Sequence, residues 1–304
     1  MNLTQIIQLL LLAGIWGASF MFMRIATPEY GPVALIGVRA IIGFITLLPF
    51  FILYKGGRDF SKHWFGIFIV GITNTAIPFL LLAFATLTLT AGLTSILNAT
   101  APIFAGLIAF IWLKEAFSGR KALGLLVGFS GVVTLFFSKS DVGFQATAIA
   151  IIAGLIAGLN YGFAACYTKK QLTGVSTLAI ATGSQFFAAL VYLPFLPSFW
   201  PVAEVTDLAF YSAIILGAIC TALAYILYFR LIASMGPEKA ITVAYLIPVF
   251  GIIWGVLFLD EQVTGIMLLG GVLIMLGVSL TTGVIKRKEK SEKPGQNTIT
   301  RNNS

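Results

Sequence analysis

Charged residues are scarce in this chain. Lys, Arg, Asp and Glu make up 10% of its 304 residues, whereas 59% are hydrophobic and the mean hydropathy is +0.99. Soluble domains carry about 25% charged residues, so the composition excludes an ordinary soluble protein and indicates a chain solvated by lipid. The apolar runs also lack the polar alternation of a membrane-spanning barrel. We therefore expect an all-α integral membrane protein.

Residues that carry catalytic or metal chemistry are equally scarce. The chain has two cysteines, Cys166 and Cys220, without the spacing of a disulfide framework or metal site, and one histidine, His63. Hydrolysis inside a membrane would need acid pairs, a serine with a histidine base, or His and Glu ligands within the bundle. The absence of a GxxxxGK loop excludes an ATP-driven pump formed by this chain alone. We expect no enzyme, no cofactor and no bound metal.

Long apolar runs are the most abundant feature. Crossing a hydrocarbon core of about 30 Å takes about 20 helical residues. Ten runs satisfy this length within a few residues, separated by short polar segments. They cover residues 5–25, 32–53, 64–83, 91–113, 122–137, 146–167, 175–196, 208–229, 240–259 and 265–285.

The distribution of charge predicts the orientation in the membrane. With the C-terminus in the cytoplasm, every even-numbered loop carries the basic excess of cytoplasmic loops. These basic residues are Lys55, Arg58, Lys62, Lys114, Arg120, Lys121, Lys169, Lys170, Arg230 and Lys239. Both termini are then cytoplasmic, in a multi-pass protein of the plasma or inner membrane. The net charge of +8 is split among short loops and the tail at 286–304, which argues against nucleic-acid binding and favours a disordered tail near lipid.

The chain contains one five-helix unit twice. A shift of 146 residues aligns Gly71 with Gly217, Pro102 with Pro248, and Glu115 with Glu261 without a gap, and further identities follow. They are Thr75/Thr221, Phe104/Phe250, Gly119/Gly265, Gly124/Gly270 and Gly131/Gly277. Since five crossings are an odd number, the second copy should be inverted in the membrane, as in transporters. We expect repeats at 1–140 and 141–285.

Here the sequence resembles the drug/metabolite transporter superfamily, specifically the ten-helix EamA-type exporters. The resemblance covers Trp16-Gly17, the segment from Pro32 to Arg39, and the segments Pro102 to Glu115 and Pro248 to Glu261. It implies an exporter of amino acids or other small metabolites that works by alternating access, with the lipid bilayer and a small-molecule metabolite as its partners. Small multidrug relatives carry a Glu near the place of Trp16. Because no acidic residue occupies the middle of a predicted span here, proton exchange through a midplane carboxylate is not supported.

Two prolines and two glutamates are candidate gating residues. Pro102 and Pro248 each lie near the bilayer midplane, where a proline frees the carbonyl four residues earlier and bends the helix. These bends could border a central cavity and move during transport, or they could be static. Glu115 and Glu261 end their helices on opposite sides of the membrane, where a carboxylate opposes the helix dipole and needs a partner. We expect each Glu to tie its helix end to the next helix or to loop amides, as part of a gate latch.

Polar and aromatic side chains in several spans could line a cavity. They offer hydrogen bonds and ring faces but no fixed charge, which suits a neutral, zwitterionic or aromatic metabolite. Individually, each could equally be a packing hydrogen bond between helices. The candidates for substrate binding are Trp16, Asn74, Asn98, Asn160, Tyr161, Thr221, Tyr225 and Tyr245, with Ser19, Thr75 and Thr100 nearby.

Arg39 is the one charge well inside a predicted span. It could pair with a carboxylate or phosphate of the substrate. The alternative is that it reaches the membrane interface or caps carbonyls of a neighbouring helix, which the sequence favours because long basic side chains snorkel readily. Its repeat partner, Gln185, is uncharged, which argues against a symmetric binding role.

The fifth and tenth spans are rich in glycine, at Gly124, Gly128 and Gly131 and at Gly270, Gly271 and Gly277. Small residues at such spacings let helices approach closely. We expect an internal scaffold rather than a dimer contact, in a monomer or homodimer. A lipid flippase or a membrane scaffold without transport activity fits the hydropathy as well as a metabolite carrier does.

Overall fold

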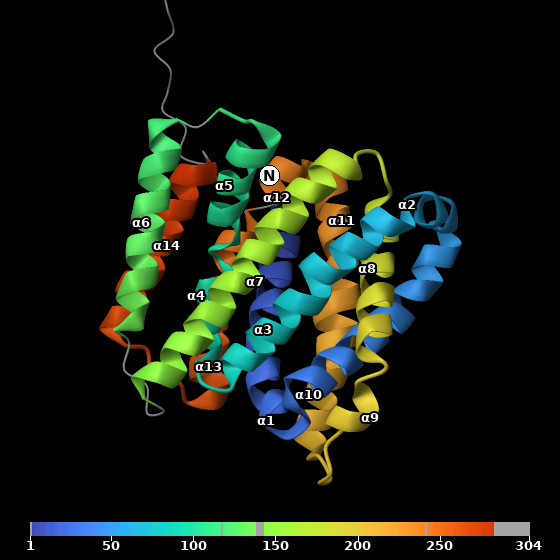
Figure 1. Cartoon of the computed structure of the whole chain (residues 1–304), viewed down its shortest axis with the longest axis horizontal. Coiled ribbons are helices and arrows are strands. Elements are labelled where there is room, and N and C mark those ends of the chain that lie inside the picture. The colour runs from blue at the N-terminus through green and yellow to red at the C-terminus, as the bar shows by residue number, and fades with distance from the viewer. Residues whose placement is uncertain (1, 117, 138–142, 241, 283–304) are drawn as a thin grey trace, which may run out of the picture.

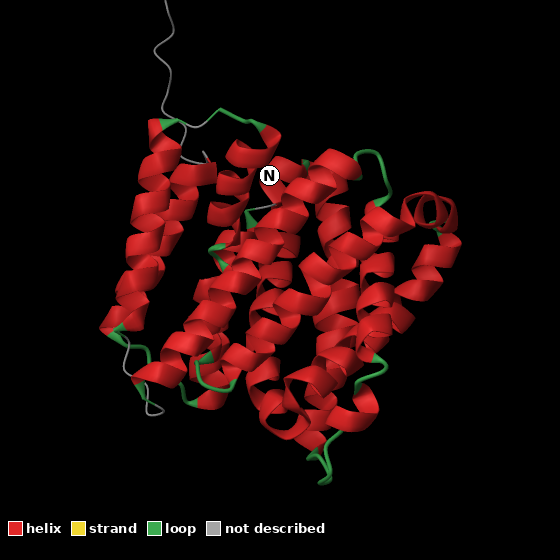
Figure 2. Cartoon of the chain, viewed as in Figure 1, coloured by secondary structure: helices red, strands yellow, loops and turns green. Residues whose placement is uncertain are grey.

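A computed structural model describes residues 2–116, 118–137, 143–240 and 242–282 (Figure 1). Within these ranges the chain is a bundle of helices joined by short loops, with no strand (Figure 2). The predicted tail at 286–304 and the predicted repeat boundary at 140/141 lie outside the described residues.

The helical segments follow the predicted spans closely. Their bounds are α1 (Leu3–Leu53), α2 (Gly57–Val70), η1 (Gly71–Ala76), α3 (Ile77–Thr86), α4 (Ala91–Asn98), α5 (Ala101–Leu113), α6 (Gly119–Phe136), α7 (Phe144–Gln171), α8 (Thr177–Tyr192), α9 (Leu196–Phe199), α10 (Asp207–Gly217), η2 (Ala218–Leu223), α11 (Ala224–Met235), α12 (Pro237–Ala240), α13 (Val243–Leu259) and α14 (Gly265–Thr282). Among the described residues, seven helical segments are long and apolar enough to cross a membrane, and the shorter α8 and α13 are also apolar.

The tenth crossing comes from α1, which contains two spans. Gly31 has φ 70° and ψ 158°, a conformation that interrupts the helix and that side chains with a Cβ rarely adopt. The 51 residues of α1 would otherwise extend roughly 75 Å, more than twice the hydrocarbon thickness. With this break, the described residues form the ten-helix membrane fold predicted from the sequence.

The third and eighth spans are less regular than the sequence predicts. Each contains a π-helical turn, η1 in the third span and η2 in the eighth, where the backbone bonds five residues apart. The two turns occupy equivalent places in the repeats: η1 begins at Gly71, and η2 begins directly after Gly217, the repeat equivalent of Gly71. A π-turn is often found at a functional site, and here it repeats with the internal symmetry.

Backbone geometry confirms that the two copies of the repeat are inverted. Lys114 and Asp260, 146 residues apart, both end a helix in the left-handed conformation, with φ 55° and 51°. Glu261 contacts Ala91 at the start of α4, whereas Glu115 follows the end of α5 in the same membrane span. The two glutamates therefore lie at opposite ends of the bundle, the Glu115 end and the Glu261 end.

The glycine-rich helices α6 and α14 pack against each other at the side of the bundle (Figure 1). A Cβ built on Gly124 would lie 2.8 Å from the carbonyl oxygen of Gly277, and one built on Gly131 would lie 2.7 Å from that of Gly270. These two contacts exchange under the 146-residue shift, so the internal symmetry axis passes between the helices. The glycines form an internal scaffold, as predicted.

The two midplane prolines occupy different backbone geometry. Pro102 lies in the first turn of α5, just after the break that ends α4 at Asn98. Pro248 lies inside the continuous helix α13. The span of the second repeat is divided earlier, between α12 and α13, so the two breaks lie at different distances from their prolines. The gating role of Pro102 and Pro248 stays a prediction.

Candidate functional site

Arg39 lies in the interior of the bundle. Its side chain is 4% exposed, its Nε donates a hydrogen bond to Thr221 Oγ1 over 3.0 Å, and its guanidinium carbon lies 3.7 Å from the ring centroid of Phe79. Nη1 lies 3.7 Å from the sulfur of Met23. The interpretation that Arg39 snorkels to the membrane interface is wrong, because the neighbouring helices close around it at depth.

No carboxylate balances this charge among the described residues. The ion pairs in those ranges both involve Glu115, at one end of the bundle. Burying an arginine costs at least about 2.5 kcal/mol in a membrane. A cation held without a counter-charge, against a hydroxyl and an aromatic ring, is suited to receive an anionic group.

Thr221 is positioned by the π-turn η2. Its hydroxyl donates to the carbonyl of Leu216, five residues earlier, over 2.8 Å, and accepts the hydrogen bond from Arg39. The side chain thus satisfies a carbonyl of the widened turn while it orients the guanidinium. Arg39 belongs to the first repeat and Thr221 to the second, so this contact joins the two repeats.

Partly exposed aromatic and amide side chains surround this contact. Asn74 of η1 donates to the Tyr225 hydroxyl over 3.4 Å. The rings of Trp16 and Tyr225 meet edge to face at 6.4 Å between centroids. Trp16 and Tyr161 also pack against the buried apolar cluster that contains Met23 and Phe79, the two apolar contacts of the guanidinium. The structure therefore brings together six of the predicted residues, namely Trp16, Arg39, Asn74, Tyr161, Thr221 and Tyr225, which we call the central cluster.

Three predicted residues have contacts elsewhere. The Asn160 amide donates to the carbonyl of Ile156 in its own helix over 2.8 Å. The Tyr245 hydroxyl is hydrogen-bonded to Thr282 at the end of α14. Asn98 ends α4, one helical turn before Pro102. These positions do not place any of the three against Arg39.

Sequence reasoning missed two contacts of the guanidinium, Phe79 and Met23. Nothing distinguishes either residue from the many apolar residues of the same spans. It also assigned no role to Gln185, which is fully buried although it is polar. The repeat alignment with Arg39 was the signal that could have identified it.

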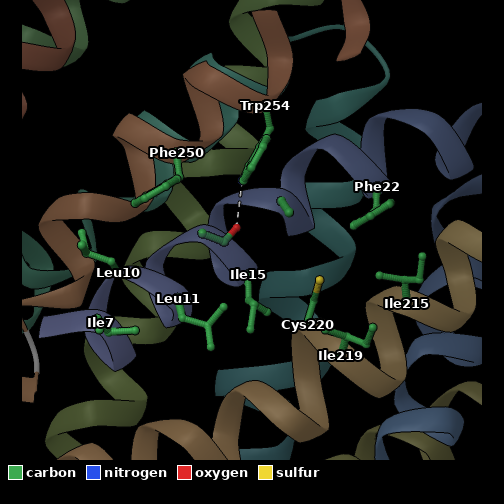
Figure 3. A pocket seen from close by; sticks show the side chains of 12 residues that line it. Ile7, Leu10, Leu11, Ile15, Phe22, Ile215, Ile219, Cys220, Phe250 and Trp254 are labelled. Carbon is green, nitrogen blue, oxygen red and sulfur yellow. Dashed lines mark hydrogen bonds between the residues drawn. The ribbon is translucent and has the colours of Figure 1, made fainter. Parts of the chain in front are cut away.

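An apolar groove of about 630 Å³ lies beside the central cluster (Figure 3). Its walls come from α1, the α10 to η2 segment and α13, where Trp254 donates to the carbonyl of Gly14 over 2.9 Å. Ile7, Leu11 and Ile219 line it and are exposed on the outside of the bundle. Cys220 also lines it and precedes Thr221, so the groove adjoins the central cluster without containing its polar groups.

The two predicted gate glutamates have different partners. Glu261 accepts hydrogen bonds from the backbone amides of Ala91 over 2.7 Å and Gly92 over 3.3 Å, at the start of α4. Glu115 accepts from Lys169 over 2.7 Å and lies 3.6 Å from Lys121. The Lys169 hydrogen bond holds the pKa of the Glu115 carboxyl below its ordinary value, and partial burial opposes this shift. Both contacts tie a helix end to a neighbouring helix.

Comparison with known proteins agrees with this architecture. The model of the EamA-like transporter family matches residues 3–137 and again 148–283. The chain belongs to this family. As an EamA-like transporter it is a multi-pass membrane protein, and its two family matches coincide with the two copies seen in the backbone.

Individual relatives of this EamA-like transporter are distant but similar over most of their length. An uncharacterized transporter of Bacillus subtilis, YdfC, is 29% identical over 92% of this chain and 91% of its own. A probable terminal-alkyne amino-acid exporter of Streptantibioticus cattleyicolor is 24% identical over 97% of this chain and 100% of its own. A protein of known crystal structure shares the fold, with a TM-score of 0.64 and 14% identity over 94% of this chain and 100% of the other.

Proposed function

We propose that this EamA-like transporter is a secondary carrier that exports small metabolites such as amino acids by alternating access. The observation that carries the proposal is Arg39, a buried cation without a carboxylate partner among the described residues, held at a contact between inverted repeats. A site between inverted repeats can face either side of the membrane when one repeat rocks against the other. The relative described as a probable amino-acid exporter supports the choice of substrate class.

Each residue of the central cluster has a role in this proposal. Arg39 binds a carboxylate of the substrate, and Thr221 holds the guanidinium in place. Trp16, Asn74, Tyr161 and Tyr225 supply ring faces and hydrogen bonds around the rest of the molecule. Asn98, Asn160 and Tyr245 line the path outside the cluster, and the gates comprise Pro102, Pro248, Glu115 and Glu261.

The proposed arrangement in the cell follows the basic loops. The repeats are residues 1–140 and 141–285, the tail is 286–304, and both termini are in the cytoplasm of a cell whose plasma or inner membrane holds the protein. The Glu115 end then faces the cytoplasm. The glycine-rich faces of α6 and α14 pack against each other and are therefore not free to form a dimer contact. We propose a monomer, or a homodimer that uses other surfaces. We propose no nucleic-acid partner and no enzymatic activity.

Counterflow in proteoliposomes tests the function. Vesicles loaded with an unlabelled amino acid should accumulate the radiolabelled form saturably, and a panel of amino acids identifies the substrate. Arg39→Gln should reduce uptake at least about tenfold, because it removes a charge-assisted hydrogen bond to the carboxylate. Arg58→Gln, which removes an exposed charge in α2, is the matched control and should transport normally. Absence of flux for the whole panel, or full activity of Arg39→Gln, would contradict the proposal.

The groove of about 630 Å³ favours one alternative, a lipid flippase, because its lining is apolar and open to the outside of the bundle. A flippase would move fluorescent phospholipids between leaflets of a vesicle, which is measured by dithionite quenching. A metabolite carrier would show counterflow without this activity.

A further inference from the structure

Several buried polar side chains lack a protein hydrogen-bond partner, and most of them lie on two facing segments. On α8 they are Thr182, Ser184 and both amide atoms of Gln185, and on η1 the hydroxyl of Thr75; Ser212 in α10 is separate. Gln185 and Thr75 are fully buried. An unsatisfied buried polar group destabilises a folded protein, whereas an apolar group of the same shape would not. Their retention at one place indicates a role other than packing.

The internal symmetry relates these two residues to the central cluster. Gln185 is the repeat equivalent of Arg39, and Thr75 is that of Thr221. α8 packs on η1 as α1 packs on η2. A Cβ built on Gly71 would lie 3.1 Å from the carbonyl oxygen of Ser184, and one on Gly217 would lie 3.0 Å from that of Arg39, so both helix pairs approach closely.

The two equivalent pairs differ in their hydrogen bonds. Thr221 donates to Leu216 and accepts from Arg39. The Thr75 hydroxyl and the Gln185 amide have neither bond. In the first pair, Arg39 carries a fixed charge that Thr221 orients. In the second pair, Gln185 and Thr75 have neutral oxygens that can still accept a hydrogen bond.

Gln185 and Thr221, one member of each pair, are neighbours in space. A Cβ built on Gly43 would lie 3.3 Å from Gln185 Oε1 and 3.2 Å from the methyl carbon of Thr221. Gly43 lies one helical turn after Arg39 on the same face of α1, about 6 Å along the helix axis. An amide oxygen thus lies beside the threonine that orients the guanidinium.

We propose that Gln185 and Thr75 form a second polar subsite, which binds the ammonium group of an α-amino acid whose carboxylate is bound by Arg39. This inference rests on the proposed function and assigns the recognition of the amino group. The oxygens of Gln185 and Thr75 accept hydrogen bonds from the ammonium group without adding charge. Because both side chains are buried in this conformation, the substrate reaches them when the rocking of the repeats moves α8 relative to η1.

The test compares an amino acid with the same molecule without its amino group. L-Phenylalanine with 3-phenylpropionate, and L-leucine with 4-methylpentanoate, are titrated against the purified full-length protein by calorimetry. Wild type should prefer the amino acid by about tenfold or more, the effect of one hydrogen bond to a charged group. Gln185→Leu and Thr75→Val should lose this preference and bind the des-amino acid within about twofold of wild type. Ser212→Ala removes an equally buried hydroxyl outside the subsite and should behave as wild type.

Thermal unfolding without ligand gives a second readout. Gln185→Leu and the nearly isosteric Thr75→Val remove unpaired polar atoms, so the midpoint of unfolding should stay equal or rise while the preference is lost. A lower midpoint with the preference retained would overturn the inference and assign the pair to packing. Wild type that binds each amino acid no better than its des-amino partner would overturn the inference alone. Wild type that binds neither kind of probe across the amino-acid panel would overturn the proposed function together with it.

Discussion

The ends of α5 and α13 have the same backbone and different chemistry. At both ends a residue in the left-handed conformation is followed by a glutamate whose backbone N–H donates to a carbonyl oxygen of the helix. Glu115 donates to Ala109 over 3.2 Å, and Glu261 donates to Gly255 over 3.1 Å. Yet the Glu261 carboxylate caps the first amides of α4, whereas the Glu115 carboxylate pairs with lysines at the surface. The repeat supplies the turn, and nearby residues decide what the acid contacts.

Two sequence differences account for the contrast. Gly255 has no Cβ, and one built there would overlap Glu261 Oε2, so only glycine lets the carboxylate fold back toward α4. The equivalent residue of the first repeat is Ala109. The equivalent of Ala91 is Pro237, which has no amide hydrogen to donate. The Glu261 end is therefore held by a charge-assisted helix cap and the Glu115 end by exposed ion pairs, which predicts gates of unequal strength.

The largest effect is expected from Glu261→Ala. The substitution leaves two amides at the start of α4 without acceptors and should reduce the free energy of unfolding by about 2–3 kcal/mol. The loss should also open the Glu261 end, so that a cysteine introduced at Thr88 reacts faster with a membrane-impermeant maleimide. Reversible unfolding in mixed micelles measures the first effect. An unchanged stability and labelling rate would mean that this contact is not a latch.

Gly255→Ala should have a somewhat smaller effect, about 1–2 kcal/mol, because the added methyl group displaces the carboxylate without removing it. Ala109→Gly is the matched variant in the other repeat. It should cost only the helix propensity of alanine, up to about 1 kcal/mol, and leave labelling at Thr88 unchanged. If the cysteine at position 88 reacted equally fast in Gly255→Ala and Ala109→Gly, the difference between Gly255 and Ala109 would not explain the unequal gates.

Glu115→Gln should change the free energy of unfolding by less than about 1 kcal/mol, since the Glu115 carboxylate is partly exposed and its lysine partners are solvated. Salt should reduce even this difference, because exposed ion pairs are screened. Unfolding at low and high ionic strength measures both. A loss as large as that of Glu261→Ala would contradict the comparison.

The smallest effect is the pH dependence of the Glu115 pair. Its carboxyl pKa is lowered in the folded protein, first by the Lys169 hydrogen bond. The pair therefore stabilises the folded state fully above the ordinary glutamate value of 4.5 and loses this contribution as the pH falls through the lower folded-state pKa. The stability difference between wild type and Glu115→Gln should therefore shrink as the pH falls below 4.5. A difference that grows below pH 4.5 would have the wrong sign.

Much of the architecture could be predicted from the sequence, because hydropathy and a gapless repeat report directly on crossings and their inversion. That α6 and α14 pack closely inside the bundle followed from glycine spacing, although not that they pack on each other, and a contact for each gate glutamate followed from helix electrostatics. The burial of Arg39 could not be predicted in this way. Snorkelling describes one helix in lipid, whereas the depth of Arg39 depends on how the other spans close around it.

The site was predicted in part for the same reason. In η2 the backbone hydrogen bonds join residues five apart instead of four, and this turn brings Thr221 within hydrogen-bonding distance of Arg39. Hydropathy gives no sign of such a turn. The local bond of Asn160 is a rotamer choice, and the contact between Tyr245 and Thr282 depends on tertiary packing. Gln185 was visible as the repeat partner of Arg39, but its significance depends on burial, which only the structure provides.

Alternating access around Arg39 is tested most directly by measuring both ends of the bundle in the same protein. Spin labels at Thr88 and Gln262 report on the Glu261 end, and labels at Ala116 and Lys239 report on the Glu115 end, after Cys166 and Cys220 are replaced. Electron–electron resonance distances are then recorded with and without a transported amino acid. The account predicts that the substrate changes the populations of the two ends in opposite directions, one opening as the other closes. Distances that change together at both ends, or at neither end, would contradict it.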